Sequence, residues 1–191
     1  MQKLIVASNS ARRQQLMRDA GFQFDVHVLD VDESLDETIA TNDAAEFLAE
    51  KKNRAYRSVF ANEIILTSDT IVIANDNILG KPKNEAEAYR MISSMSGKSH
   101  EVISGVCISG HDREISFSDI TVVQFENLTE EEIRYYIKNY QPYDKAGSYG
   151  IQEWLGMIGI QSIQGSFYNV MGLPIHKVYQ ILRSDFGISP L

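Results

Sequence analysis

The sequence contains a single cysteine, Cys107. One thiol excludes an internal disulfide and a zinc site built from several cysteines. No apolar run approaches the roughly 18 residues that a membrane-spanning helix needs. The first residues turn polar too soon for the apolar part of a signal peptide. We therefore expect a cytoplasmic protein without a membrane partner.

Positive charge is also scarce, because 18 Lys and Arg stand against 26 Asp and Glu, for a net charge of −8. Proteins that hold nucleic acid usually carry a basic face, so we expect no nucleic-acid partner. Hydrophobic residues make up 43% and charged residues 23%, close to the average of globular proteins, which excludes a disordered chain. The length predicts a single domain over residues 1–191, or two small lobes.

Apolar segments that suit strands alternate with segments that suit helices. We expect strands at 4–7, 24–29, 64–68, 71–74, 100–107 and 115–125, and helices at 11–20, 41–59, 84–97, 129–139 and 174–183. An acidic loop is expected at 31–40 and a turn at 110–112. Six glycines between 147 and 172 predict tight turns between short strands. This order of elements predicts an α/β fold with a mixed sheet.

The segment Ser8-Asn9-Ser10-Ala11-Arg12-Arg13 lies where the first strand passes into the first helix. Free backbone N–H groups at a helix start attract phosphate, and two guanidinium groups add positive charge there. Arginines oppose the helix dipole at this end, so they need another reason to be present. We interpret the segment as a phosphate site; the alternative is a solvated first turn.

One lysine interrupts an apolar helix face. The positions that recur at 3-4-3-4 spacing are Ala45, Leu48, Lys52, Ala55 and Val59. Their polar neighbours Lys51, Asn53 and Arg54 are expected in solvent. A buried ammonium group costs several kcal/mol unless an anion meets it. Lys52 therefore either meets an anion or reaches solvent from the margin of the apolar stripe.

Asp69 separates the two apolar strands expected at 64–68 and 71–74. A carboxylate between buried strands is costly, and metal binding or proton transfer are the usual reasons to keep it. The alternative is an aspartate that caps a hairpin turn. Glu33 is a second candidate carboxylate or a solvated acid. Lys81 stands between Gly80 and Pro82, which restrict its backbone, although this tripeptide is common in loops.

Taken in order, these segments resemble the Maf family of nucleoside triphosphate pyrophosphatases. The matching segments are 4–13, Glu33, Lys52, 68–70, 79–82, 96–97, 100–102, 104–106, 144–152 and 165–174. One departure is Ser10-Ala11-Arg12-Arg13, where the family usually has Ser-Pro-Arg-Arg. Alanine is a strong helix former, so the helix start should be kept.

The resemblance implies an α/β fold with a twisted mixed sheet, flanking helices and two lobes around a cleft, similar to inosine triphosphate pyrophosphatases. It also implies hydrolysis of a nucleoside triphosphate to the monophosphate and pyrophosphate with Mg²⁺ or Mn²⁺. The catalytic residues it implies are Asp69, Lys52 and Lys81, with Asp69 as the proton acceptor. It further implies metal ligands Glu33 and Asp69 and substrate-binding residues Ser8, Arg12, Arg13, Thr70 and Gln152.

Within the family, the segment 144–152 is similar to the branch that acts on dTTP and UTP rather than 7-methyl-GTP. The resemblance assigns base specificity to Arg12, Thr70 and Gln152. A glutamine carboxamide offers both donors and acceptors, as the edge of uracil or thymine requires. Modified pyrimidine triphosphates, nucleotide house-cleaning and a homodimer are further expectations. Two other functions stay open: a non-enzymatic regulator of cell division or septum formation, and a pyrophosphatase for purine triphosphates of the inosine or 7-methyl-GTP type.

Overall fold

A computed structural model of the chain describes residues 3–35, 38–110 and 112–190. Residues 36 and 37 of the expected acidic loop and residue 111 of the expected turn lie outside the described residues. None of the described helices is long and apolar enough to cross a membrane.

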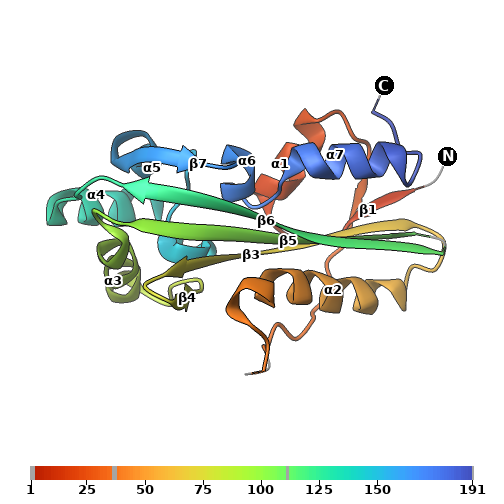
Figure 1. The fold of residues 1–191 in the computed structure, drawn as a ribbon, viewed down its shortest axis with the longest axis horizontal. Helices are drawn as coiled ribbons and strands as arrows, with labels where there is room; N and C mark the ends of the chain where they lie inside the picture. Colours follow the sequence, from red (N-terminus) through yellow and green to blue (C-terminus); the bar gives the residue numbers. More distant parts are fainter. Residues whose placement is uncertain (1–2, 36–37, 111, 191) are drawn as a thin grey trace. The chain divides into compact units, whose positions relative to one another are not determined.

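The described residues contain a seven-stranded mixed sheet (Figure 1). Its strands are β1 (Leu4–Val6), β2 (Asp25–Val26), β3 (Ile64–Ala74), β4 (Asn77–Leu79), β5 (Ser99–Gly110), β6 (Arg113–Phe125) and β7 (Ile160–Gln164). The order is β2-β1-β3-β5-β6-β7, and β4 pairs with β3 beside this path. β1 runs parallel to β2 and β3, whereas β4 and β7 run antiparallel to β3 and β6. The predicted mixed α/β fold is confirmed.

The helices are α1 (Ala11–Asp19), α2 (Ala44–Arg57), α3 (Glu85–Met95), α4 (Glu130–Tyr140), α5 (Trp154–Gly159), α6 (Phe167–Val170) and α7 (Ile175–Ser184). Three 3-10 turns are η1 (Thr41–Asp43), η2 (Pro142–Asp144) and η3 (Ala146–Ser148). Thr129 and Glu132 form a capping box at the start of α4, and Asn84 caps α3. These caps explain why the predicted starts of α3 and α4 agree with the structure.

Three sequence predictions are wrong in detail. The strands expected at 64–68 and 71–74 are one continuous strand, β3, because Asp69 and Thr70 are only partly buried and need no turn to reach solvent. The strand expected at 24–29 shrinks to two residues, and its later positions are largely exposed. The glycine-rich region, expected to form tight turns between short strands, contains two short helices and one strand. One of its glycines, Gly156, lies within α5, where a Cβ would collide with the Ile151 carbonyl group.

The chain divides into two compact units. Unit 1 contains residues up to 69, 104–119 and 172 onward; unit 2 contains residues 70–103 and 120–171. In unit 1, α2 covers one face of the sheet while α1 and α7 cover the other (Figure 1). α2 lies so close to β5 that a Cβ on Gly105 would fall 2.2 Å from the backbone of Ala45. A glycine is therefore required there.

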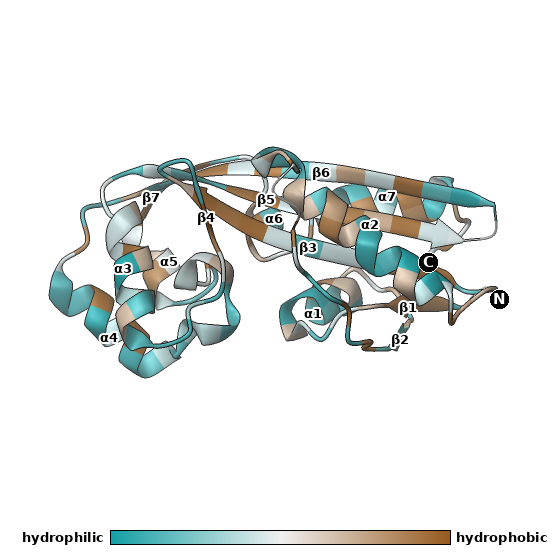
Figure 2. Cartoon of the chain, turned by 90° about the horizontal axis from the view of Figure 1, so that it is seen from below, coloured by the Kyte–Doolittle hydropathy of each residue, from teal (hydrophilic) through white to brown (hydrophobic). Residues whose placement is uncertain are grey.

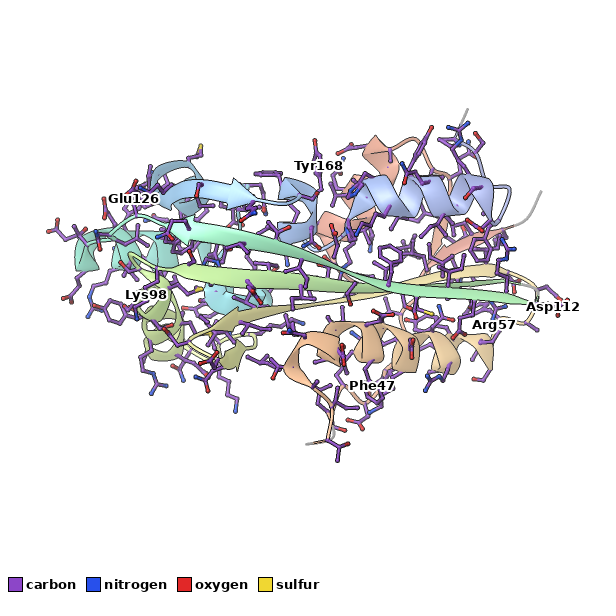
Figure 3. All side chains as sticks on the ribbon, viewed as in Figure 1. Phe47, Arg57, Lys98, Asp112, Glu126 and Tyr168 are labelled. Atoms are coloured by element: carbon purple, nitrogen blue, oxygen red, sulfur yellow. The ribbon has the colours of Figure 1, made fainter. Side chains whose placement is uncertain are left out.

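Arg57 fixes the C-terminal end of α2 in unit 1 (Figure 3). Its guanidinium group donates to the carbonyl oxygens of Phe60 at 2.9 Å, Glu63 at 3.0 Å and Ser109 at 2.7 Å. A guanidinium group has five N–H donors in a rigid plane, so one arginine can hydrogen-bond several backbone carbonyl groups at once. The helix is thereby held at a defined place along the sheet.

The buried strands are coloured as apolar in the hydropathy view (Figure 2). The core of unit 2 packs β3 and β6 residues against α3, α4 and the segment around residue 149, with Val72, Ile92, Phe125, Tyr136, Tyr149 and Leu155 all buried. The core of unit 1 contains Leu4, Ile5, Met17, Ile65 and Leu66. Burying one such side chain contributes about 1.5–3 kcal/mol, so each unit rests on its own apolar interior.

Candidate active site

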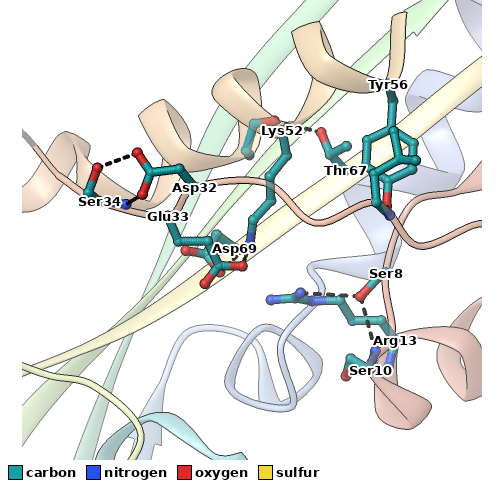
Figure 4. Close-up of polar contacts among 12 residues, drawn as sticks. Ser8, Ser10, Arg13, Asp32, Glu33, Ser34, Lys52, Tyr56, Thr67 and Asp69 are labelled. Atoms are coloured by element: carbon teal, nitrogen blue, oxygen red, sulfur yellow. Dashed lines mark hydrogen bonds and ion pairs between the residues drawn. The ribbon is translucent and has the colours of Figure 1, made fainter. Parts of the chain in front are cut away.

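The segment from Ser8 to Arg13 forms a structured corner of unit 1. Ser10 caps α1 by accepting from the backbone N–H of Arg13 at 3.4 Å. The Arg13 side chain donates to Ser8 Oγ at 3.4 Å and to the carbonyl oxygen of Gly172 at 2.7 Å (Figure 4). The helix starts at Ala11 without the proline that is usual in the family, as expected. Ser8 and Arg13 are therefore brought together, and Arg12, which is partly buried, directly precedes Arg13 in the first turn of α1.

Lys52, on α2, lies between two carboxylates of unit 1. Its Nζ is 2.8 Å from Glu33 Oε1 and 3.2 Å from Asp69 Oδ1 (Figure 4). The Lys52 side chain is 13% exposed and the Asp69 side chain 18%, whereas Glu33 is 54% exposed. The sequence left open whether Lys52 meets an anion or only reaches solvent, and the structure supports the first. Lys52, Glu33 and Asp69 are far apart in sequence but form one cluster.

Asn53 corrects the predicted helix face. We expected it in solvent, yet it is fully buried, while Val59 is exposed. Its side-chain amide donates to the carbonyl oxygens of Ile65 at 3.3 Å and Cys107 at 3.1 Å. A buried amide with these partners ties α2 to β3 and β5. The apolar pattern was misjudged because the helix buries a neighbouring stripe that contains a polar residue.

The Asn53 contacts explain the placement of Lys52. The two residues are consecutive on α2, so their side chains point about 100° apart around the helix axis. With Asn53 fixed over β3 and β5, Lys52 is directed along the sheet surface toward Asp69 on β3. Buried Thr67, two residues before Asp69, donates to the Ala49 carbonyl oxygen at 2.7 Å and so holds β3 against the same helix. The Lys52–Asp69 distance is therefore set by regular elements.

Arg13 shares the electrostatic environment of this cluster. Burial lowers the pKa of Arg13, the charges of Asp69 and Glu33 act to raise it, and Arg12 acts to lower it. An arginine stays protonated in proteins even when its pKa is lowered. Unit 1 thus holds cationic groups and two carboxylates within reach of one another's fields. Such a mixture can bind an anion and polarise a water molecule at one place.

Glu33 and Asp69 are the carboxylates of this cluster that could ligate a metal ion. In the described parts of the chain, no three or more His, Cys, Asp and Glu side chains gather closely enough to hold an ion by themselves. Mg²⁺ is often bound by only one or two carboxylates, with waters and substrate phosphates completing its shell. Glu33 and Asp69 supply two carboxylates, hard oxygen donors that both pair with Lys52 Nζ. This donor set fits a divalent ion that arrives with a triphosphate.

The remaining predicted residues belong to unit 2. Thr70 follows Asp69 on β3, Lys81 is exposed in the loop after β4, and Gln152 is exposed before α5. The backbone N–H of Gly147 donates to the carbonyl oxygen of Gly80 at 3.1 Å. This contact joins the loop that carries Lys81 to the segment 144–152.

Sequence reasoning missed two participants. Gly172 is one residue of the matching segment 165–174, and no role was predicted for it. Its carbonyl oxygen orients Arg13 and also accepts from Ser68 Oγ at 3.4 Å. No side chain signals that role. Asn53 could have been found, because a helix-forming stripe shifted by one position places it between Ala49 and Tyr56.

Two residues whose side chains could carry chemistry are instead buried in the core. His100 is buried in the core of unit 2, where its Nε2 atom forms a hydrogen bond of 2.7 Å with the hydroxyl group of Tyr149. Burial lowers its pKa to about 4. Cys107 is buried, and burial raises its pKa to about 12, so its thiol is not a nucleophile at neutral pH.

Comparison with known proteins agrees with the motifs. Residues 3–185 match the family described as Maf-like protein. The chain is 47% identical over 183 residues to a dTTP/UTP pyrophosphatase of Parabacteroides distasonis and 48% identical to one of Bacteroides thetaiotaomicron, covering 95% of each chain in both cases. A Ham1 protein structure from Staphylococcus aureus matches with a TM-score of 0.44 and 15% identity over 65% of this chain and 72% of that one. The match to the family model and the identity to the two pyrophosphatases establish that the chain belongs to the Maf family.

Proposed function

We propose that this chain hydrolyses dTTP and UTP to the monophosphate and pyrophosphate with the help of a divalent cation. The observation that carries the proposal is the cluster of Lys52, Glu33 and Asp69 beside the Arg13 corner. Full-length similarity to relatives named dTTP/UTP pyrophosphatase supports the substrate class.

Asp69 is the proposed general base. A water molecule attacks the α-phosphorus, its proton passes to the Asp69 carboxylate, and the bond from the α-phosphorus to the bridging oxygen breaks. Pyrophosphate leaves with the bonding electrons. A positioned base contributes roughly 10²–10⁴-fold to rate. Lys52 Nζ, 3.2 Å from Asp69 Oδ1, donates to that carboxylate and orients it.

Positive side chains receive the triphosphate. Arg12 and Arg13 offer planar donors that match phosphate oxygens, and Ser8 adds a hydroxyl group beside Arg13. Lys52 and Lys81 add compact charges. Because the protein as a whole is acidic, with a net charge of −8, these groups bind phosphate locally rather than through a general basic field.

Glu33 and Asp69 are the proposed ligands of Mg²⁺ or Mn²⁺. When bound, a divalent ion would neutralise phosphate charge and make a coordinated water more acidic. Glu33, being half exposed, can turn an oxygen toward an ion that a nucleotide carries in. Lys52 keeps the two carboxylates close together before substrate arrives.

Gln152, Thr70 and Arg12 are the proposed determinants of base choice. Cytosine presents an amino group where uracil has a carbonyl oxygen, so a site that hydrogen-bonds uracil leaves a group unpaired with CTP. We therefore expect dTTP and UTP, and modified pyrimidine triphosphates of the same edge pattern, to be preferred. A nucleotide house-cleaning role in the cytoplasm and a homodimer remain predictions, which cell fractionation and light scattering can test.

The deciding experiment measures pyrophosphate release from dTTP, UTP, CTP, purine triphosphates and 7-methyl-GTP with Mg²⁺ and with Mn²⁺. The proposal expects metal-dependent release, with kcat/KM for dTTP and UTP well above the rest. No release from any nucleotide would support a non-enzymatic regulator instead. A preference for inosine triphosphate or 7-methyl-GTP would replace the pyrimidine assignment with a purine one.

A further inference from the structure

Unit 2 contains a second lysine that meets two carboxylates. Lys145 Nζ lies 2.8 Å from Asp144 Oδ1 and 3.1 Å from Glu153 Oε1. The Lys145 side chain is only 9% exposed. We call Tyr136, Asp144, Lys145 and Glu153 the Lys145 cluster. Asp144 and Lys145 stand at the start of the segment 144–153 and Glu153 at its end, directly after Gln152.

The cluster reaches the backbone through a tyrosine. The second carboxylate oxygen of Glu153 accepts from the hydroxyl group of Tyr136 on α4. The same hydroxyl oxygen accepts from the backbone N–H of Gly150 at 2.9 Å. One ion pair and two hydrogen bonds therefore connect Lys145 through Glu153 and Tyr136 to Gly150, two residues before Gln152.

Other contacts hold the same segment from its opposite side. Tyr149 Oη is 2.7 Å from His100 Nε2 in the buried core. Gly147, with φ of +67°, leaves no room for a side chain, because a Cβ would lie 3.0 Å from the Val72 methyl groups. The backbone before Gln152 is thus fixed at residues 145, 147, 149 and 150, while the Gln152 side chain is itself exposed.

We propose that Lys145 is a positioning residue for nucleotide selectivity, which orients Gln152 by holding Glu153 and, through Tyr136, the backbone of Gly150. The inference rests on the proposed function, because it assumes that Gln152 reads the base. Lys145 differs from Lys52 in what its partners hold, because Asp144 and Glu153 flank the segment that carries Gln152, and Glu153 reaches the Gly150 amide through Tyr136.

The ionic character of the cluster supports orientation over stability. Taking a lysine and a glutamate out of water offsets most of their attraction, so such a pair contributes little net stability. What it supplies instead is direction, because each hydrogen bond requires a defined position of its donor and acceptor. An apolar pair in the same place would fill the volume without fixing the Gly150 amide.

The test compares Lys145→Met, Lys145→Arg and a control, Lys138→Met, which removes an exposed lysine from α4. For Lys145→Met we expect the KM for dTTP to rise about tenfold, kcat to stay within about twofold, and the dTTP/CTP ratio of kcat/KM to fall about tenfold. Lys145→Arg should recover part of the ratio, and Lys138→Met should leave it unchanged. In a Gln152→Ala background, Lys145→Met should cause no further fall, because both changes act on one contact.

A second readout needs no nucleotide. Hydrogen exchange of the Gly150 amide should become about tenfold faster in Lys145→Met, because its acceptor, Tyr136 Oη, loses its own anchor. If Lys145→Met does not fold, Glu153→Gln removes the ion pair while keeping the side-chain shape, and the same selectivity loss is expected.

Three results would overturn the inference. One is an equal loss of kcat/KM on every nucleotide that persists with Gln152→Ala, which would make Lys145 a phosphate contact. Another is a lower Tm with unchanged kinetics, which would make it structural only. The third is unchanged Gly150 exchange. A wild-type protein that does not prefer dTTP and UTP would overturn the proposed function instead, and is recognised before any variant is made.

Discussion

Lys52 and Lys145 each form ion pairs with one aspartate and one glutamate. Lys52 in unit 1 is 13% exposed, with Asp69 at 18% and Glu33 at 54%. Lys145 in unit 2 is 9% exposed, with Glu153 at 19% and Asp144 at 62%. In each case one carboxylate is mostly buried and one is largely in water. Residue type and burial alone do not separate the two clusters.

Their connections separate them. Lys52 projects from a helix that Asn53 fixes on the sheet, and Asp69 lies on a strand, with the charge of Arg13 acting on the same region. Lys145 and Glu153 bracket a loop, and Tyr136 passes their constraint to the backbone. A cluster on rigid elements near further cations suits chemistry on an anion. A cluster that closes a loop suits placing another residue.

The largest expected effect tests the chemical role of the Lys52 cluster. Asp69→Asn should lower kcat by about 10²–10⁴-fold, because an amide cannot accept the proton of the attacking water. The Tm should stay close to that of the wild type, since the side chain keeps its size. Steady-state pyrophosphate release and thermal unfolding check both statements.

Asp32→Asn is the matched control for Asp69→Asn. Asp32 is also an aspartate paired with a lysine, Lys51 at 3.0 Å, but it is 72% exposed in the loop next to Glu33. Its removal should change kcat less than twofold, because Asp32 pairs with Ser34 and Lys51 rather than with Lys52. Retention of more than a tenth of wild-type turnover by Asp69→Asn would remove Asp69 from the mechanism, since about 10²-fold is the smallest loss a base predicts.

The next effect concerns the pH dependence of unit 2. Burial lowers the pKa of His100 to about 4, so between pH 4 and 6.5 the unfolded chain binds a proton that the folded chain does not. Stability from this group is complete above about pH 6.5 and is lost as the pH falls toward 4. The loss approaches about 3 kcal/mol.

His100→Gln isolates that contribution. A glutamine can still bond to the Tyr149 hydroxyl group but does not titrate. Denaturant unfolding at pH 7, 5.5 and 4.5 should show a steeper fall of the free energy of unfolding in the wild type than in the variant. Parallel curves for the two proteins would show that folding does not lower the pKa of His100.

A smaller effect tests whether Lys52 acts on substrate. Lys52→Met should reduce kcat/KM for dTTP about 30-fold, or ~2 kcal/mol, the worth of a hydrogen bond to a charged group. The free energy of unfolding should change by less than about 1 kcal/mol, because the lost ion pair and the removed desolvation cost offset each other. Lys51→Met, one residue earlier, is the control and should leave kcat/KM unchanged. Clear destabilisation with normal kinetics would make Lys52 structural.

The sequence predicted the helix starts of this fold better than the long-range contacts around the two lysines. Caps at Ser10, Asn84 and Thr129 act within four residues, so their helix starts could be read locally. For Lys52 the pattern left an anion and solvent both open, and Asp69 was expected between two strands rather than within one, so the residue pattern did not predict their contact. The burial of Asn53 and the role of the Gly172 carbonyl depend on neighbours up to 159 residues away, and backbone atoms carry no sequence signal. The contacts that connect Lys145 to the Gly150 amide through Glu153 and Tyr136 were missed for the same reason, because they also involve another helix and a backbone atom.

The smallest expected effect is the sharpest test of the loop, because it asks for a change in preference rather than in rate. Gln152→Ala should reduce the dTTP/CTP ratio of kcat/KM about tenfold while lowering kcat for dTTP much less, since the residue is exposed and lies in a different unit from Asp69. Gln161→Ala, which removes an equally exposed glutamine from β7, is the control and should leave the ratio unchanged. The same panel of nucleotides should be used for both variants and for Asp69→Asn, whose losses should be equal on every substrate. If Gln152→Ala slows every nucleotide equally, base choice comes from the shape of the site, and the Lys145 cluster then has no base-reading side chain to orient.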